Sequence, residues 1–322
     1  MQSSSLECLL NGMQILHNIA ELQTIAGSVH LALGVFDGVH VGHQEVILNA
    51  VKSAREEGGK VGVITFEPHP VRVLAPDRAP SRILASIAHK ADLLGSMGVD
   101  FLCVQEFTLD FAAREAREFI GDLMKYSNDL ETIAVGEDWI FGKARGGNVD
   151  KLRTWGAEME FSVTAAAPVM VDGERVSSTR VRQAVRDGNL TAVRKMLGRP
   201  YDVVGTVIEG KKLARTLGFP TANVVVHNEQ LPPAGVWSLK VKFRGESYNG
   251  IGNLGRRPTV EQEGARRLLE IHVFDFDGDL YGETIDAEFV TYLRKEKKFE
   301  SVEELKSQIE ADVARAKLAF SK

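Results

Sequence analysis

The first half of the chain alternates short apolar runs with segments of helical spacing. The runs occupy residues 29–35, 61–66, 99–104, 133–135 and 161–166. They are continuous, as expected of strands buried on both faces of a parallel sheet. Helical spacing separates them, at residues 112–125 and at Ile47, Ala50, Val51 and Ala54. Alternating strands and helices predict a Rossmann-like α/β domain, whose ligands bind beyond the carboxyl ends of the strands.

The pattern changes near residue 200. Two short helices are predicted at residues 181–186 and 191–197, and Gly198-Arg199-Pro200 then interrupts the periodicity. We therefore expect one domain over residues 13–199 and a second over residues 200–322, with residues 1–12 as a short extension.

The pattern of the second half predicts closely spaced strands. Runs rich in β-branched and aromatic residues occupy residues 201–208, 236–243, 247–251, 268–276 and 284–292. Asp277-Gly278 is a hairpin turn signal. A final helix is indicated by a capping box of Ser301 with Glu304 and by an apolar stripe of Val302, Leu305, Ile309 and Val313. The second half is therefore predicted to be a small antiparallel β-barrel followed by a C-terminal helix.

Composition narrows the function classes. The 322 residues are 44% hydrophobic and 26% charged, which is ordinary for a globular protein of about two domains. The net charge of −5 argues against a nucleic-acid-coating protein. Two cysteines, Cys8 and the core residue Cys103, make neither a disulfide framework nor a Cys-rich zinc site, so we expect a reducing, cytoplasmic setting.

Targeting signals are not apparent. No apolar stretch approaches the ~18 residues of a membrane span. The first Lys or Arg is Lys52, so the positive region of a signal peptide is missing. We expect neither a membrane nor a nucleic-acid partner, and the sequence leaves a homo-oligomer open.

The strongest chemical signal lies between the first predicted strand and the first predicted helix. It reads Gly34-Val35-Phe36-Asp37-Gly38-Val39-His40-Val41-Gly42-His43. Its glycines permit a sharp turn, and the start of the helix offers N–H groups to phosphate. Because His40 and His43 are three residues apart, both imidazoles can donate hydrogen bonds to phosphoryl oxygens on one side. The alternatives are structural histidines, or half of a zinc site for which no second Cys/His cluster is present.

Three further blocks fit a nucleotide site. Pro68 and Pro70 indicate a rigid extended loop that borders a flat ring of the ligand, or simply a stiff loop. Asp138, in the block of residues 136–142 that also holds Phe141, suits a ribose hydroxyl, a metal or a cap. The last block consists of residues that either cap a helix or hold phosphate: Ser178, Thr179 and Arg182.

Together these blocks resemble the HxGH nucleotidyltransferases, and most closely the adenylyltransferase half of the prokaryotic bifunctional riboflavin kinase/FMN adenylyltransferases. The resemblance implies that the FMN phosphate attacks the α-phosphorus of ATP, giving FAD and pyrophosphate, with Mg²⁺ assisting. It also implies that the residues named above bind ATP and the flavin, among them Gly34, Phe36, Asp37 and Gly38.

The second half contains its own glycine-rich block over residues 205–223. Its candidate phosphate-binding residues are Gly205, Gly210, Lys211, Arg215, Gly218 and Pro220. Gly-Lys-Ser/Thr is absent, so this is not a Walker loop. Thr221 and Asn223 are two apart on an extended segment, so both oxygens point the same way and suit Mg²⁺, although a turn with local hydrogen bonds is the commoner explanation of such a pair.

This half is similar to the riboflavin kinase barrel, which shares the blocks at residues 220–223 and 252–259, the latter including Asn253. The resemblance implies that Glu270 is the general base for the 5′-hydroxyl of riboflavin. Departures from the family are Ala214 in place of glycine, Trp237 in place of tyrosine and Trp139 in place of phenylalanine. They weaken the expectation of efficient kinase activity most.

Other functions remain as alternatives. The barrel of a transferase-only protein would merely hold flavin, which Ala214 favours. A nucleic-acid binder would need interleaved aromatic and basic residues, whereas only 7% of this chain is aromatic. A different HxGH transferase, such as one acting on pantetheine phosphate, leaves the kinase-like block unexplained.

Overall fold

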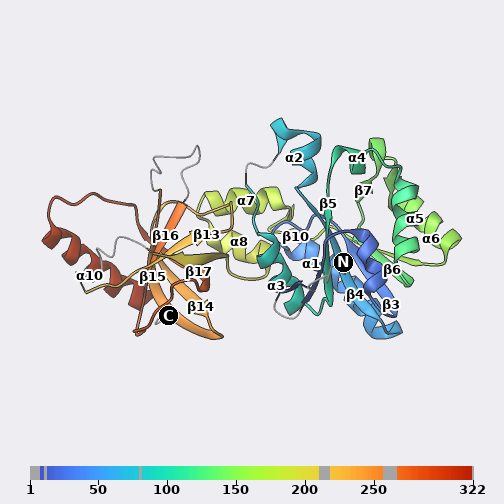
Figure 1. The fold of residues 1–322 in the computed structure, drawn as a ribbon. Coiled ribbons are helices and arrows are strands. Elements are labelled where there is room, and N and C mark those ends of the chain that lie inside the picture. Colours follow the sequence, from blue (N-terminus) through green and yellow to red (C-terminus); the bar gives the residue numbers. More distant parts are fainter. Residues whose placement is uncertain (1–7, 11–12, 80–81, 210–217, 257–266, 321–322) are drawn as a thin grey trace. The chain divides into compact units, whose positions relative to one another are not determined.

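The structure is a computed structural model that describes residues 8–10, 13–79, 82–209, 218–256 and 267–320 (Figure 1). Its contacts form two compact units: an α/β unit of Met1–Arg82 with Ile87–Thr179, and a barrel unit of Ile83–Ser86 with Arg180–Lys322. This division falls inside α7 (Ser178–Arg186). Contact density does not say where a functional domain ends, so the boundary between residues 199 and 200 stays a prediction.

The α/β unit contains a seven-stranded sheet in the order β1-β2-β5-β4-β3-β6-β9. Its strands are β1 (Cys8–Leu10), β2 (Met13–Leu16), β3 (Ser28–Leu33), β4 (Lys60–Glu67), β5 (Phe101–Glu106), β6 (Asp129–Gly136) and β9 (Ser162–Ala166). All neighbours pair in parallel except β1 with β2. The Rossmann-like prediction and its five strands are confirmed, whereas β1 and β2 were not anticipated.

Helices cover both faces of this sheet. On one face, α1 (Val41–Glu57) and α3 (Ile87–Ser96) bury Ile47, Ala50 and Leu94. On the other, α5 (Ala116–Tyr126) and α6 (Val149–Met159) bury Ile120 and Leu152. The predicted helix over residues 112–125 is split, because Glu115 and Glu118 form a capping box that starts α5 after the separate α4 (Leu109–Ala112).

Cys103 is an inert core thiol, as predicted. It lies fully buried in β5, and burial raises its thiol pKa to about 12.

The barrel unit contains α8 (Leu190–Leu197) and a closed six-stranded barrel in the order β12-β13-β16-β15-β14-β17. The strands are β12 (Asp202–Ile208), β13 (Ala222–Val226), β14 (Gly235–Phe243), β15 (Glu246–Arg256), β16 (Arg267–Val273) and β17 (Thr284–Arg294). Fully buried residues such as Leu239, Leu269 and Ile271 fill its interior. The predicted antiparallel barrel is confirmed.

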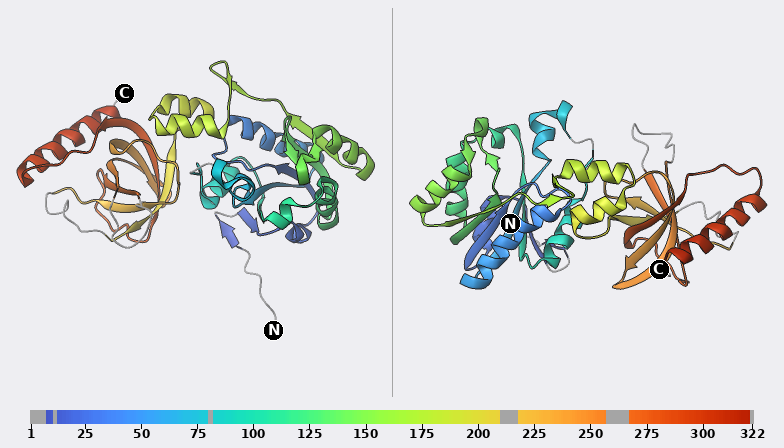
Figure 2. Two further views of the ribbon diagram at one scale, coloured as in Figure 1. Left: turned by 90° about the horizontal axis from the view of Figure 1, so that it is seen from above. Right: turned by 180° about the vertical axis from the view of Figure 1, so that it is seen from behind.

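The final helix, α10 (Val302–Ala319), runs along the outside of the barrel (Figure 2). Ser301 caps it by accepting a 3.1 Å hydrogen bond from the Glu304 N–H. The Glu304 carboxylate returns to the N–H of Glu300 rather than of Ser301, so the capping box is shifted by one residue. The predicted stripe holds except at Val302, which is 57% exposed.

The hairpin expected at Asp277-Gly278 is wrong. The segment between β16 and β17 covers residues 274–283, and these strands are not neighbours in the barrel. The tight turn instead joins β14 to β15 at Arg244-Gly245, with φ values of 51° and 79°. Two consecutive positive φ angles match a type I′ turn, which fits the twist of paired strands.

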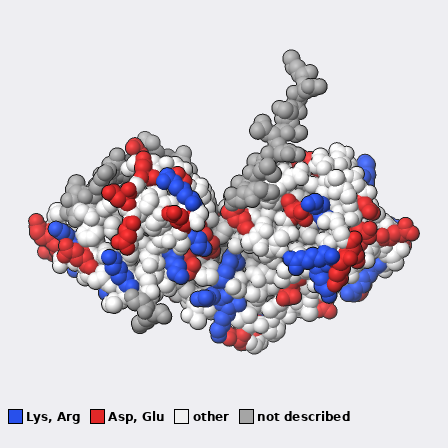
Figure 3. Space-filling view, turned by 90° about the horizontal axis from the view of Figure 1, so that it is seen from below, with Lys and Arg blue, Asp and Glu red and all other residues white. Residues whose placement is uncertain are grey.

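No helix of the described ranges is both long and apolar enough to cross a membrane. Acidic and basic side chains are interspersed on the face drawn in Figure 3.

Candidate active sites

The loop of residues 34–40 leaves β3 at the switch point of the sheet, because β4 and β6 lie on either side of β3. Its backbone is unusual: Phe36 and Val39 have φ values of 51° and 44°, which non-glycine side chains rarely adopt. A Cβ on Gly34 would lie 2.9 Å from Cζ of Phe36, so any larger residue here would displace the ring that folds back over it. A strained path of this kind persists only where the surroundings enforce it.

The structure brings His40 and His43 together, as the spacing predicts. Their rings stack with centroids 3.5 Å apart, and the Phe36 ring meets His43 edge-on at 5.4 Å. His40 is the N-cap of α1, and its Nδ1 accepts a 3.2 Å hydrogen bond from the His43 N–H. A neutral His40 in this arrangement carries its proton on Nε2, which is the donor that a phosphoryl oxygen needs.

His43 is held in its neutral form. Burial, followed by the charges of His40 and Lys90, lowers its pKa well below the ordinary value of 6.5. Its imidazole therefore acts near neutral pH as a hydrogen-bond donor rather than as a cation.

Lys90 is a buried charge that our sequence analysis missed. It lies on α3, is only 4% exposed, and donates to the Val35 carbonyl at 2.8 Å and to Thr65 Oγ1 at 3.0 Å. The signal was available, because Lys90 occupies an apolar position of the helical pattern formed with Ile87, Ala91 and Leu94.

The proline block differs from the prediction. Pro70 is the first residue of α2 (Pro70–Leu74), and His69 Nδ1 caps this helix by accepting from the Val71 N–H at 3.2 Å. Proline suits the first helical position because a backbone N–H there would have no acceptor within the helix, so its absence costs nothing. The extended segment is therefore limited to Pro68 and His69.

Asp138 and Phe141 lie at the carboxyl end of β6. Asp138 is exposed and pairs with Arg175 at 2.7 Å, a contact the sequence did not suggest. Phe141 stacks on Trp139 with centroids 4.0 Å apart and meets Phe119 edge-on. The pair of rings forms an aromatic surface at the same edge of the sheet as the histidine loop.

Ser178 joins the start of α7 to this loop, because its hydroxyl donates to the Asp37 carbonyl at 2.9 Å. Asp37 is itself buried, at 3% exposure. Thr179 follows Ser178, and Arg182 lies one turn further along, within the barrel unit. The phosphate-binding roles of Thr179 and Arg182 stay predictions.

In the barrel unit, three polar side chains from three strands meet. Glu270 on β16 lies directly opposite Asn223 on β13 and opposite Asn253 on β15. Partners that face each other in an antiparallel ladder project to the same side of the sheet. Since Leu269 and Ile271 fill the interior, Glu270 and its two neighbours face outward.

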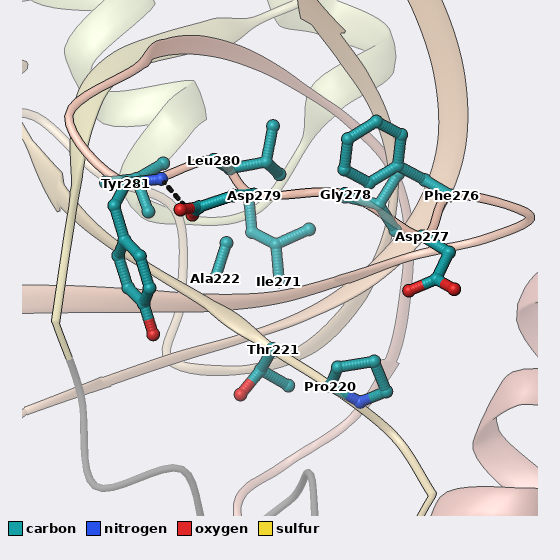
Figure 4. Close-up of a pocket in the computed structure, with 12 residues that line it drawn as sticks. Pro220, Thr221, Ala222, Ile271, Phe276, Asp277, Gly278, Asp279, Leu280 and Tyr281 are labelled. Carbon is teal, nitrogen blue, oxygen red and sulfur yellow. Dashed lines mark hydrogen bonds between the residues drawn. The ribbon is translucent and has the colours of Figure 1, made fainter.

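Two cavities share Thr221, and the first of them also has Asn253 and Glu270 in its lining. One, of about 330 Å³, lies between the barrel and α10; it is lined by Phe219, Asn253, Glu270, Phe299, Leu305 and Ile309, among others. The second, of about 360 Å³, lies under the loop of residues 276–281. Figure 4 shows Asp277 and Tyr281 on opposite sides of Thr221 in this second cavity.

Two contacts that the sequence analysis did not predict shape these cavities. His272 Nδ1 lies 2.8 Å from the Pro220 carbonyl and fixes the segment that carries Thr221. Arg294 donates from Nε to Asp312, a 2%-exposed residue of α10, at 2.8 Å, which fastens this helix beside the first cavity.

The remaining kinase candidates are glycines and loop residues. A Cβ on Gly205 would lie 2.5 Å from Val224 Cγ1, so close strand packing accounts for this glycine. Gly218 has a φ of 90° and precedes the Pro220 segment. Gly210, Lys211, Ala214 and Arg215 lie outside the described residues.

The fold and these sites are typical of a transferase with a nucleotidyltransferase half and a kinase half. The sequence matches the FAD synthetase family over residues 22–180 and the riboflavin kinase family over residues 197–320. The bifunctional riboflavin kinase/FMN adenylyltransferase of Haemophilus influenzae is 36% identical over 310 residues, which is 96% of this chain and 100% of that protein. The enzyme of the same name from Escherichia coli K12 is 38% identical over 306 residues, 95% of this chain and 96% of its own.

A crystal structure described as a macrolide-efflux protein of Streptococcus pneumoniae has a TM-score of 0.79 and 30% identity, covering 95% of this chain and 99% of its own. The chain belongs to the bifunctional riboflavin kinase/FMN adenylyltransferase family. It phosphorylates riboflavin to FMN and adenylylates FMN to FAD, with ATP as the second substrate of both reactions.

Proposed function

We propose that the histidine loop of the α/β unit performs adenylyl transfer and that the Glu270 group of the barrel unit performs riboflavin phosphorylation. The observation that carries this assignment is that each unit has its own group of polar side chains. The stacked His40 and His43 lie at the start of a helix, and Glu270 lies between Asn223 and Asn253 and lines one of the two cavities.

In the kinase reaction, riboflavin occupies the cavity lined by Phe219, Phe299 and Ile309, whose apolar and aromatic walls suit a flat ring. Glu270 lies in the same cavity and accepts the proton of the 5′-hydroxyl as that oxygen attacks the γ-phosphorus of ATP. The bond from the γ-phosphorus to the bridging oxygen breaks, and ADP leaves. ATP occupies the neighbouring cavity, and its phosphates meet the flavin chain at Thr221, which both cavities share.

Mg²⁺ fits the donor set at this meeting point. The Thr221 hydroxyl and the buried Asn223 amide offer neutral oxygens, and no group of three His, Cys, Asp or Glu side chains suited to a metal occurs in the described residues. Mg²⁺ typically takes few protein ligands and completes its shell with water and substrate phosphates. When bound, it would neutralise charge on the phosphates of ATP.

In the adenylyl transfer, a phosphate oxygen of FMN attacks the α-phosphorus of ATP, and pyrophosphate leaves. The imidazole N–H groups of His40 and His43 stabilise the charge that develops on the phosphoryl oxygens, without a covalent intermediate. The aromatic surface of Trp139 and Phe141 and the Pro68 segment border the flavin or the adenine. The phosphates of ATP and the departing pyrophosphate are held by Ser178, Thr179 and Arg182.

Two single substitutions test the assignment. Glu270→Gln should lower the rate of FMN formation by about 10²–10⁴-fold while FAD still forms from added FMN. His43→Ala should do the reverse, with a loss of about 10²–10³-fold in FAD formation. Chromatography of two separate incubations, one with riboflavin and one with FMN, each with ATP and Mg²⁺, measures the two reactions independently. Equal loss of both reactions in either variant would contradict two separate sites.

The cellular setting is part of the proposal. A cysteine count of only two favours a cytoplasmic enzyme, and the acidic composition favours small-molecule partners over nucleic acid. A homo-oligomer is compatible with both sites.

A further inference from the structure

We propose that Lys90 is a positioning residue for the adenylyl transfer: its ammonium group holds the loop of residues 34–39 so that the two histidines at the start of α1 keep their stacked arrangement. The inference rests on the proposed role of those histidines.

The first argument is what Lys90 binds. Its two acceptors are neutral, the Val35 carbonyl and the Thr65 hydroxyl, and Thr65 Oγ1 also donates to the same carbonyl at 2.8 Å. These three bonds form a triangle that fastens the loop to β4 and α3. Val35 directly precedes Phe36, where the backbone turns into the left-handed region.

The second argument is the strain of the loop. Phe36 and Val39 both have positive φ values, and such strained residues persist only where their surroundings enforce the conformation. Lys90 and Ser178 anchor the loop at two carbonyls, those of Val35 and Asp37. Between these anchors lies Phe36, whose ring contacts His43. Loss of the hydrogen bonds of Lys90 would therefore displace the histidines through the Phe36 ring.

The third argument is the choice of residue. An ammonium group that is 4% exposed carries a desolvation penalty, so methionine, with a similar stem, would pack at this position without it. Packing alone therefore does not account for a lysine at this position. Its charge also acts on His43, together with that of His40, while Asp37 and Glu67 act on Lys90.

The test compares Lys90→Met with Lys60→Met in the full chain. Lys60 lies at the opposite end of β4, is half-exposed and pairs with Asp100 at 2.8 Å, so it is a matched lysine remote from the loop. For Lys90→Met we expect kcat of FMN adenylylation to fall by about 10- to 100-fold, because displacement of reacting groups by about 1 Å has effects of this size. The KM for ATP should change less than about threefold, because the loss is in alignment rather than in ground-state binding.

Three controls belong to the same experiment. Riboflavin phosphorylation by the same variant should stay within about twofold of the wild type, and the melting temperature at pH 7 should not fall, since a desolvation penalty is removed. Lys60→Met should leave both reactions unchanged. Thr65→Val removes the two bonds that involve the Thr65 hydroxyl, keeps the bond from Lys90 to the Val35 carbonyl and changes the shape little, so it should lower the adenylylation kcat by a smaller factor.

Full adenylylation by Lys90→Met would overturn the inference. A lower melting temperature with loss of both reactions would also overturn it, because Lys90 would then merely support the fold. If Lys90→Met does not fold, Thr65→Val decides: a selective fall in adenylylation supports the inference, and unchanged kcat refutes it. If instead His43→Ala retains adenylylation, the assignment of the histidine site fails, which is a distinct outcome.

Discussion

The free energy of unfolding, measured as a function of alkaline pH, would report the energetic cost of burying Lys90. Burial lowers its pKa from the ordinary 10.5 to about 8, against the opposing effects of Asp37 and Glu67. Each tenfold change in proton affinity corresponds to about 1.4 kcal/mol, so the shift represents about 3 kcal/mol of folding free energy.

The sign follows from proton binding. Below about pH 8 the folded and unfolded states both keep the Lys90 proton. The full cost of burying the ammonium group then lowers the free energy of unfolding. Between about pH 8 and pH 10.5 the folded state has released the proton and the unfolded state has not, so unfolding takes up a proton. The free energy of unfolding contributed by Lys90 therefore rises with pH across this window.

Urea unfolding of the wild type and Lys90→Met from pH 7 to pH 10.5 isolates this contribution, since the other titrating groups are common to both. We expect the wild type to gain up to about 3 kcal/mol relative to the variant over the window. Lys60→Met should show no comparable pH-dependent difference. A difference between wild type and Lys90→Met that is constant with pH would refute the reasoning.

Three other predictions concern the two sites. Gly34→Ala places a Cβ 2.9 Å from the Phe36 ring, so FAD formation should fall at least about tenfold in a coupled assay while FMN formation persists. Ile309→Trp fills part of the 330 Å³ cavity; steady-state kinetics should show a higher KM for riboflavin with little change for ATP, and the opposite pattern would exchange the two cavity assignments. Chelation of Mg²⁺ should stop both reactions and readdition should restore them; FMN formation that survives chelation would contradict the Thr221–Asn223 assignment.

Much of the fold was predictable because buried strands and helix faces repeat with different periods. The five central strands of the α/β unit and most of the barrel strands carried a clear pattern. β2 did not, because it is four residues long and includes the polar Gln14. The Asp277-Gly278 signal failed because local turn chemistry does not decide which strands become neighbours in a closed barrel.

The site was predictable where a contiguous motif carried it and not where distant residues met. The stacking of His40 on His43 follows from helical spacing. The contacts of Asp138 with Arg175 and of Arg294 with Asp312 join separate segments, and residue spacing contains no sign of them. Lys90 was missed because no motif contains it, and its partners Val35 and Thr65 lie on other segments of the chain.

The two catalytic centres are completed at different stages of translation. Every residue proposed for adenylyl transfer precedes the end of α7 at Arg186, whereas the riboflavin cavity draws on β13, β15, β16 and finally α10 at Val302–Ala319. A ribosome would thus have translated more than one hundred further residues before the wall formed by Leu305 and Ile309 existed. A nascent chain arrested between these points should convert supplied FMN to FAD while being unable to make FMN itself.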